Sequence, residues 1–161
     1  MSRAHTKKDY LVLVAWIGGL MAVGSVLGFV TKGSVETWYL TLNRSPLTPP
    51  DFVFGITWSV LYAMIAISGW LIWRAKPFAG LPTIKKLYIA QLVLNWSWTP
   101  LFFTCHLTGV ALICLTAILA LVVTLVMKTY KPLTTASLLL IPYALWLSFA
   151  GYLNFYIWQA N

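Results

Sequence analysis

The chain has 161 residues, of which 60% are apolar and only 9% are charged, and its formal net charge is +8. Soluble domains average about 45–50% apolar and about 25% charged residues. This composition therefore excludes a soluble domain, a disordered chain and a small disulfide scaffold. A bilayer-spanning helix needs about 20 mostly apolar residues, so four or five spans account for nearly the whole chain. We expect an integral, multi-pass membrane protein.

Breaks in the apolar pattern divide the chain into five predicted spans within one membrane domain, residues 1–161. The spans cover residues 10–30, 52–73, 81–104, 109–127 and 135–158, and a polar loop of residues 31–51 separates the first two. The first run is longer than the roughly 7–15 apolar residues of a signal peptide and has no cleavage site after it, so we expect it to be retained. The sequence predicts an all-α bundle of five transmembrane helices.

The basic residues predict the orientation of the bundle. With five spans, one face receives the N-terminus and two loops, which carry most of the basic residues: Arg3, Lys7, Lys8, Arg74, Lys76, Lys85, Lys86, Lys128 and Lys131. The other face has only Lys32 and Arg44. Because cytoplasmic loops are rich in Lys and Arg, we expect a cytoplasmic N-terminus and a non-cytoplasmic C-terminus. The bases are scattered without a nucleic-acid-binding motif, so we expect no nucleic-acid partner.

Polar side chains inside the predicted spans are neutral. No Asp, Glu, Lys or Arg lies deep in a span, which argues against an ion pump, a proton-coupled carrier and a voltage sensor. Gln91 and Asn95 are four residues apart and Trp98 follows three later, so all three share one helix face. The amides either form hydrogen bonds between helices or make a polar patch in an apolar ligand pocket.

Aromatic residues are abundant, with 9 Trp, 8 Tyr and 8 Phe. An interfacial belt accounts for Trp38 and Trp158, near the ends of spans. It does not account for Trp58, Trp96, Trp98 or Trp146, which lie well inside spans. Their indoles need a partner for the N–H group and offer flat faces for stacking.

One stripe of the fifth span combines an indole, a small residue and an amide. Pro142, Trp146, Ala150 and Asn154 recur every four residues and therefore share a face. Ala150 leaves room there either for a flat ligand or for a closely packed helix. The prolines inside spans, Pro100 and Pro142, are expected to kink their helices.

The usual catalytic and metal-binding patterns are absent from the sequence. Cys105 and Cys114 form no CxxC, and no His completes a zinc spacing, so we expect two small buried apolar side chains and no metal site. No Ser-His-Asp, Cys-His or paired carboxylates occur within the spans, so we expect no catalytic residues and no ordinary acid–base or nucleophilic chemistry.

Three motifs of several residues each occur along the chain. The first is Trp38-Tyr39-x-x-Leu42 followed by Pro49-Pro50-x-x-Val53-Phe54-x-x-x-Trp58-x-x-Leu61-Tyr62. The second is Gln91-Leu-x-Leu-Asn95-Trp-x-Trp98-x-Pro100-x-Phe102-Phe103, and the third is Pro142-Tyr143-x-x-Trp146-x-x-Phe149-Ala150-x-x-Leu153-Asn154. These motifs resemble, in the same order, those of the TspO/MBR family of tryptophan-rich sensory proteins and translocator proteins. The resemblance covers essentially the whole chain.

The resemblance implies a five-helix bundle, often a homodimer, with a cavity that binds porphyrins such as protoporphyrin IX and haem and needs no other cofactor. By motif position, the ligand-binding residues would be Trp38, Pro49, Pro50, Trp58, Tyr62, Asn95, Trp98, Trp146, Phe149, Ala150 and Asn154. The loop that carries Trp38, Pro49 and Pro50 would cover the cavity. The family's sterol motif ends in Lys or Arg, where this chain has Gln159, so sterol binding is the least supported of these inferences.

The resemblance also orders the candidate functions, in what we expect to be a bacterial cell membrane. A sensor or receptor that binds porphyrins and regulates tetrapyrrole levels or a stress response ranks first. A transporter of porphyrins or other small hydrophobic molecules ranks second, and light-dependent porphyrin degradation ranks third. Because His5, His106 and Cys105 lie away from the Trp and Asn residues, we expect recognition by ring stacking, with Arg44 or Lys32 near the propionates.

Overall fold

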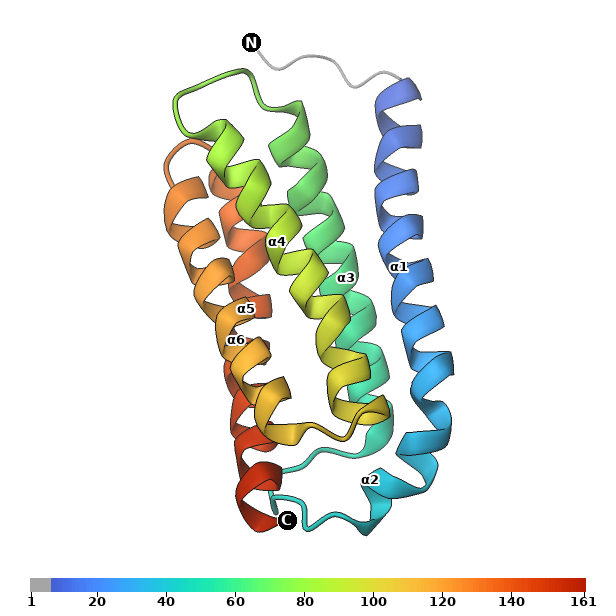
Figure 1. Ribbon diagram of the computed structural model, residues 1–161. Helices are drawn as coiled ribbons and strands as arrows, with labels where there is room; N and C mark the ends of the chain where they lie inside the picture. Colours follow the sequence, from blue (N-terminus) through green and yellow to red (C-terminus); the bar gives the residue numbers. More distant parts are fainter. Residues whose placement is uncertain (1–6) are drawn as a thin grey trace.

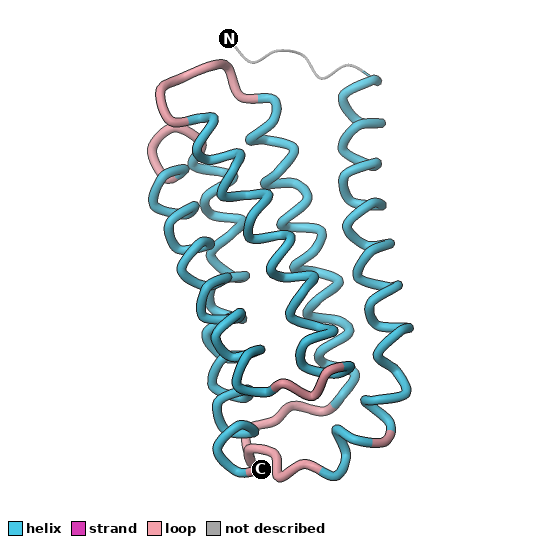
Figure 2. The backbone as a smooth tube through the Cα atoms, viewed as in Figure 1, coloured by secondary structure: helices cyan, strands magenta, loops and turns pink. Residues whose placement is uncertain are grey.

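Five long helices lie side by side in the computed structural model, which describes residues 7–161 (Figure 1). They are α1 (Lys7–Glu36), α3 (Asp51–Arg74), α4 (Leu81–Thr99), α5 (Thr108–Thr129) and α6 (Thr134–Ala160). A short helix, α2 (Trp38–Thr41), follows α1, and a π-helical turn, η1 (Pro100–Thr104), follows α4. The described residues contain no strand (Figure 2), which confirms the all-α membrane fold. The expectations about Arg3 and His5 lie outside the described residues.

The helix bounds agree closely with the sequence except in the first helix. α3, α5, α6 and the continuous α4–η1 segment begin and end within two residues of the predicted bounds. The first helix is longer than the predicted span of residues 10–30, because α1 runs from Lys7 to Glu36. The hydroxyl of Thr31 donates to the carbonyl of Leu27 at 2.8 Å and that of Thr37 to the carbonyl of Gly33 at 2.7 Å. These residues satisfy their own polar groups within the helix, so polarity alone does not end it.

Four of the described helices, α1, α3, α5 and α6, are long and apolar enough to cross a membrane. By these criteria of length and composition α4, the predicted third span, is not counted, although it is one of the five long helices of the bundle. α4 falls short because Lys85, Lys86, Gln91 and Asn95 lie within its 19 residues. It nevertheless packs along α5 as part of the same bundle (Figure 1).

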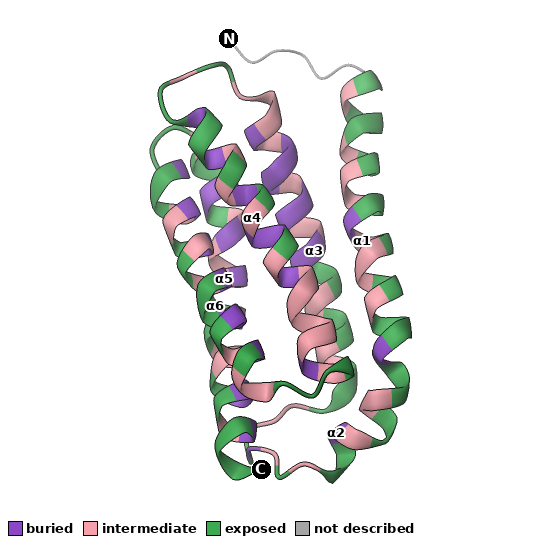
Figure 3. Ribbon diagram, viewed as in Figure 1, coloured by how far each residue is buried: buried purple, intermediate pink, exposed green. Residues whose placement is uncertain are grey.

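The hydrophobic core lies among α3, α4, α5 and α6, and α1 packs on its outside. Buried residues gather on the facing sides of these four helices, whereas α1 is mostly exposed or half-buried (Figure 3). Leu20 and Thr31 are the buried residues of α1. α1 approaches α3 closely at Gly24, where an added Cβ would lie 2.6 Å from Cε2 of Tyr62. Any larger residue at Gly24 would push α1 away from the core.

Pro100 changes the helix type. Its carbonyl accepts a hydrogen bond of 2.9 Å from the backbone N–H of Cys105, five residues later, which is the π-helical pattern. The turn widens the end of the α4–η1 segment and leads into His106, which has a positive φ of 57°. Cys105 is exposed on this turn, so the prediction of a buried side chain is wrong for Cys105 and confirmed for Cys114.

Candidate functional site

A cavity of about 300 Å³ lies between the helices toward the end of the bundle that holds the C-terminus. All five long helices, α2 and η1 contribute side chains to its wall. Most of these side chains are aromatic or aliphatic, with Asn95 and Asn154 as the two amides. Small-molecule sites are typically apolar pockets of about 300–1,000 Å³ with a few polar groups, and this cavity fits the lower end of that range.

A buried network of hydrogen bonds runs across three helices and includes the wall residues Tyr62 and Asn95. The hydroxyl of Tyr62 on α3 donates to Oδ1 of Asn95 on α4 at 2.9 Å. Nδ2 of Asn95 donates to the hydroxyl of Tyr143 on α6 at 2.8 Å. The ring of Trp58 lies beside both tyrosines, with centroid distances of 5.5 Å to Tyr62 and 6.4 Å to Tyr143. The hydrogen bonds hold the two tyrosine rings around one amide, and Trp58 packs beside them.

A second hydrogen-bonded pair lies nearer the C-terminal end of α6. Nε1 of Trp98 donates to Oδ1 of Asn154 at 3.1 Å, and Nδ2 of Asn154 donates to the carbonyl of Thr108 at 2.8 Å. Trp98 also stacks on Phe102 of η1, with ring centroids 5.2 Å apart and planes at 21°. Asn154 thus connects α4, α5 and α6 and keeps the Trp98 ring on the cavity wall.

Gln91 behaves differently from Asn95, although both lie on the same face of α4. Its side chain is fully buried but does not line the cavity. Both its oxygen and its nitrogen have no hydrogen-bond partner among the described residues. Asn95 combines the two roles that the sequence left open, since it bonds between helices and lines the cavity, whereas Gln91 has neither role.

The first loop, defined here as residues 37–50, lies at the cavity end of the bundle and is fastened to the end of α6 (Figure 1). The backbone N–H of Asn43 donates to Oδ1 of Asn161 at 2.9 Å, and Nδ2 of Asn161 donates to the carbonyl of Asn43 at 3.2 Å. The hydroxyls of Ser45 and Tyr152 are 2.9 Å apart. These contacts hold the loop in one position, with Tyr39 on the cavity wall.

The charged groups near the cavity are paired with one another. Nη1 of Arg44 lies 4.0 Å from Oδ1 of Asp51, and its guanidinium lies 5.1 Å from the centre of the Tyr39 ring. Burial raises the pKa of the Tyr39 hydroxyl, and the positive charge of Arg44 opposes that rise. Both Tyr39 and Asp51 line the cavity, so this end of it is the polar one.

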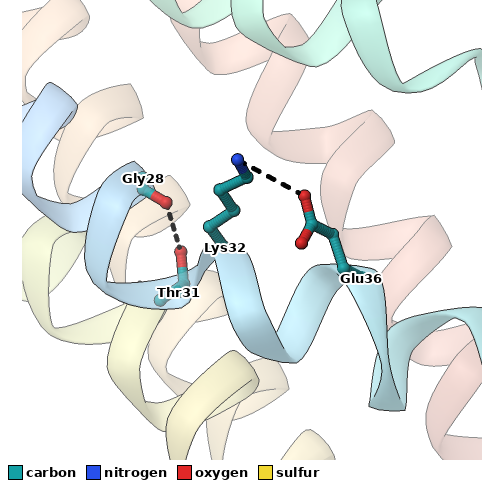
Figure 4. Close-up of polar contacts among 4 residues, drawn as sticks. All are labelled: Gly28, Thr31, Lys32 and Glu36. Atoms are coloured by element: carbon teal, nitrogen blue, oxygen red, sulfur yellow. Dashed lines mark hydrogen bonds and ion pairs between the residues drawn. The ribbon is translucent and has the colours of Figure 1, made fainter.

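On α1, polar residues point in different directions (Figure 4). Thr31 is buried, lines the cavity and lies with its hydroxyl 3.4 Å from the carbonyl of Gly28. Nζ of Lys32 lies 3.6 Å from Oε1 of Glu36, and both side chains are exposed. Neither Lys32 nor Arg44 lines the cavity. Arg44 contacts the wall residues Tyr39 and Asp51, so it is the better placed of the two basic residues predicted to meet an anionic ligand group.

The family model for the TspO/MBR family matches residues 16–159. The chain belongs to the TspO/MBR family. It is 36% identical over 153 residues to the tryptophan-rich protein TspO of Archaeoglobus fulgidus, covering 95% of this chain and 99% of that protein. It is 34% identical over 145 residues to the translocator protein of Bos taurus, covering 88% of this chain and 86% of that protein. Protein CrtK of Rhodobacter capsulatus is 31% identical over 136 residues, covering 80% and 81% of the two chains.

As a TspO/MBR protein, the chain is a membrane sensor or receptor of the TspO kind. The structure brings seven of the residues expected from the family's motifs to the cavity wall. These are Trp58, Tyr62, Asn95, Trp98, Trp146, Ala150 and Asn154. They come from three helices that are distant in sequence, and their convergence depends on the bundle.

The other four expected residues do not line the cavity. Trp38 stacks on His106 with ring centroids 4.0 Å apart, at the outer end of the bundle. Pro49 and Pro50 precede the first turn of α3, where proline favours helix initiation. Phe149 lies in a separate groove between α3 and α6. These residues shape the surroundings of the cavity.

Sequence reasoning missed several wall residues. They are Tyr39, Phe54, Phe102 and Phe103 among the aromatics, and Gly28 and Thr31 on α1. Tyr39, Phe54, Phe102 and Phe103 all occur in the quoted motifs, so membership of a motif was the available signal. Nothing in the sequence distinguished Thr31 from the other polar residues of the predicted loop. In residues 7–161, no group of three or more His, Cys, Asp or Glu could hold a metal ion.

Proposed function

We propose that this protein binds a porphyrin, such as protoporphyrin IX or haem, in the cavity and regulates tetrapyrrole levels or a stress response. The observation that carries the proposal is the combination of Trp58, Trp98 and Trp146 with two amides on one apolar wall. Flat aromatic faces stack on a flat macrocycle, and the few polar groups orient it. Arg44, at the polar end beside Asp51, is available to a carboxylate of the ligand.

The size of the cavity requires some movement when a macrocycle binds. At about 300 Å³ the cavity is near the lower limit for small-molecule sites. α1 is the element that yields most readily, because Leu20 and Thr31 are its buried residues and the core lies among the other helices. A porphyrin would therefore be accommodated by a small outward displacement of α1 from α3.

The charge distribution supports a cytoplasmic N-terminus. The N-terminal end of the bundle holds the helix-end residues Lys7, Arg74 and Lys128 (Figure 1). Lys76 lies at the same end, in the turn between α3 and α4. Nη2 of Arg74 lies 3.2 Å from Oδ2 of Asp9. The sequence has only 3 Asp and Glu against 11 Lys and Arg, so most of the basic residues have no acidic partner. Because positive charge collects on the cytoplasmic side, we place the cavity end and the C-terminus on the opposite side.

The test is a titration of the purified protein, in lipid nanodiscs, with protoporphyrin IX. Porphyrin absorbance and tryptophan fluorescence are followed in the dark and under illumination. We expect quenching, because stacking brings the macrocycle into contact with three tryptophans of the cavity wall. We expect it to saturate at no more than one porphyrin per chain, because the ligand occupies this one cavity. Empty nanodiscs are the control for partition into lipid. Quenching that rises without saturation, as in empty nanodiscs, would overturn the proposal.

A further inference from the structure

A second hollow lies on the outside of the bundle, between α3 and α6, and has a volume of about 500 Å³. We call it the outer groove. Its α3 wall contains Ile56, Thr57, Val60, Leu61 and Met64, and its α6 wall contains Pro142, Leu145, Trp146 and Phe149. Val60 is 54% exposed and Leu145 is 67% exposed. Exposed apolar side chains on membrane-spanning helices face the acyl chains of the bilayer.

Trp146 is the one residue that lines both the outer groove and the cavity. Its indole therefore separates the interior of the bundle from the lipid-facing surface at this level. Two other aromatic rings support it from the side, Phe54 with a centroid distance of 5.8 Å and Phe149 with 5.7 Å. Neither ring is parallel to the indole, since the interplanar angles are 72° and 56°.

No hydrogen bond fixes the Trp146 ring in place. Its Nε1 is buried and has no partner among the described residues. Trp98, by contrast, is held by Asn154. An indole held only by apolar contacts changes rotamer without breaking a hydrogen bond, and a buried N–H without a partner destabilises the closed position. Trp146 thus combines the position of a partition with the absence of a polar restraint.

The hydrogen bonding of α6 is interrupted one turn before Trp146. Pro142 lies inside α6, four residues before Trp146. Proline has no N–H for the carbonyl four residues earlier and weakens the helix at that turn. On the cavity side of the partition, Ala150 and Gly55 are small residues on the wall, and an added Cβ at Gly55 would meet no atom within 4 Å. The Trp146 ring therefore has space into which it can move.

We propose that the outer groove is a lateral portal, through which a flat, bilayer-soluble aromatic molecule passes from the membrane into the cavity when the Trp146 indole swings aside. The portal rests on the proposed function in that its passenger is the ligand of the cavity. It removes any need for such a ligand to cross the first loop, which is fastened to α6 through Asn43 and Asn161. Trp146 is a gating residue in addition to a wall residue.

The test is to fill the groove from the lipid side and to measure how fast the ligand exchanges. Leu145→Trp places a bulky ring in the groove at a position that does not itself line the cavity. Leu138→Trp is the matched control, because Leu138 lies seven residues earlier on the same face of α6, is 53% exposed and does not line the groove. The probe is protoporphyrin IX transferred from phosphatidylcholine vesicles to nanodiscs that contain the protein.

A blocked portal raises the barrier in both directions and leaves the end states unchanged. We expect Leu145→Trp to slow association and dissociation about tenfold each while Kd changes less than about twofold. Leu138→Trp should change neither rate. If Leu145→Trp fails to fold, Val60→Trp fills the groove from the α3 wall. Rates that match the wild type in a folded groove-filling variant would overturn the portal.

A readout without porphyrin separates the portal from the proposed ligand. Ala150→Cys places a thiol on the cavity wall in a background with Cys105→Ser and Cys114→Ala. We expect bilayer-dissolved pyrenylmaleimide to label this thiol about tenfold more slowly when Leu145→Trp is added, and at an unchanged rate with Leu138→Trp. A wild type that binds no protoporphyrin overturns the proposed function alone. Labelling that Leu145→Trp does not slow overturns the portal alone.

Discussion

The indole of Trp98 and the amide of Asn154 form a hydrogen bond of 3.1 Å that joins α4 to α6 at the cavity wall. The other end of the same amide donates to the carbonyl of Thr108, so the orientation of Asn154 is determined from two sides. The bond satisfies an indole N–H in a mainly apolar wall, where an unpaired donor would be costly. The position of the Trp98 ring, which any stacking ligand would meet, therefore depends on a residue of another helix.

A double-mutant cycle should detect this bond as a coupling energy. Trp98→Phe removes the donor, Asn154→Ala removes the acceptor, and the free energies of unfolding are measured by denaturant titration in detergent micelles. We expect a coupling of about 0.6 kcal/mol and no more than about 1.7 kcal/mol, as for other hydrogen bonds between membrane helices. The control pair is Trp73→Phe with Asn154→Ala, because Trp73 lies near the far end of α3. A coupling equal to that of the control pair would contradict the assignment.

Ala150→Phe should weaken protoporphyrin binding at least tenfold, or about 1.4 kcal/mol. Ala150 lines the cavity, and the larger ring occupies space that the ligand needs. The measurement is the same quenching titration in nanodiscs, with circular dichroism to show that the helices are retained. Ser148→Phe is the matched control, since Ser148 is exposed on α6 and lies outside the cavity wall. An unchanged affinity in Ala150→Phe would mean that porphyrin binds elsewhere.

Haem and metal-free protoporphyrin should bind within about tenfold of each other, or about 1.4 kcal/mol. Many haem proteins hold the iron through a proximal His. Among the described residues the histidine is His106, which stacks on Trp38 and does not line the cavity. His106→Ala should therefore leave the affinity ratio of the two ligands unchanged, even if both bind more weakly. A hundredfold preference for haem that His106→Ala abolishes would show that His106 is an iron ligand.

Gln91→Met should raise the free energy of unfolding by about 1–3 kcal/mol, which is the cost of a buried polar group without a partner. Gln91 is fully buried, and neither end of its amide is bonded within the described part of the chain. Methionine fills a similar volume without polar atoms. The control is Gln159→Met at the exposed end of α6, where no change is expected. A lower stability of Gln91→Met would show that the amide is satisfied in the folded protein, for example by a buried water molecule.

The C-terminus should lie outside the cytoplasm. A fluorescent reporter that matures only in the cytoplasm should stay dark when fused after Asn161. The same reporter fused into the turn of residues 75–80, which holds Lys76 at the opposite end of the bundle (Figure 1), should fluoresce. The physical reason is the collection of basic residues at the N-terminal end. A bright C-terminal fusion with a dark turn fusion would reverse the orientation.

The composition and the pattern of apolar residues were sufficient to predict the class of protein and most helix bounds. Long apolar runs separated by Arg74 to Pro77 and by Lys128 to Pro132 determine where α3, α5 and α6 begin and end, because charged residues and proline do not continue a membrane-spanning helix. The predicted first span, residues 10–30, is shorter than α1, which runs from Lys7 to Glu36. Polar side chains such as Thr31 bond to their own helix, which a count of polar residues does not reveal.

The cavity wall required the tertiary structure. The sequence put Gln91 and Asn95 on one face of α4, but only packing decided that Asn95 meets Tyr62 and Tyr143 while Gln91 meets no partner. Phe149 and Ala150 are likewise neighbours in one motif. In the packed bundle, Ala150 lines the cavity and Phe149 lines the outer groove. A helix period assigns residues to faces, whereas the rotation of each helix against its neighbours decides which face looks inward. That rotation depends on contacts between residues far apart in the chain, such as Gly24 with Tyr62, and no local pattern encodes it.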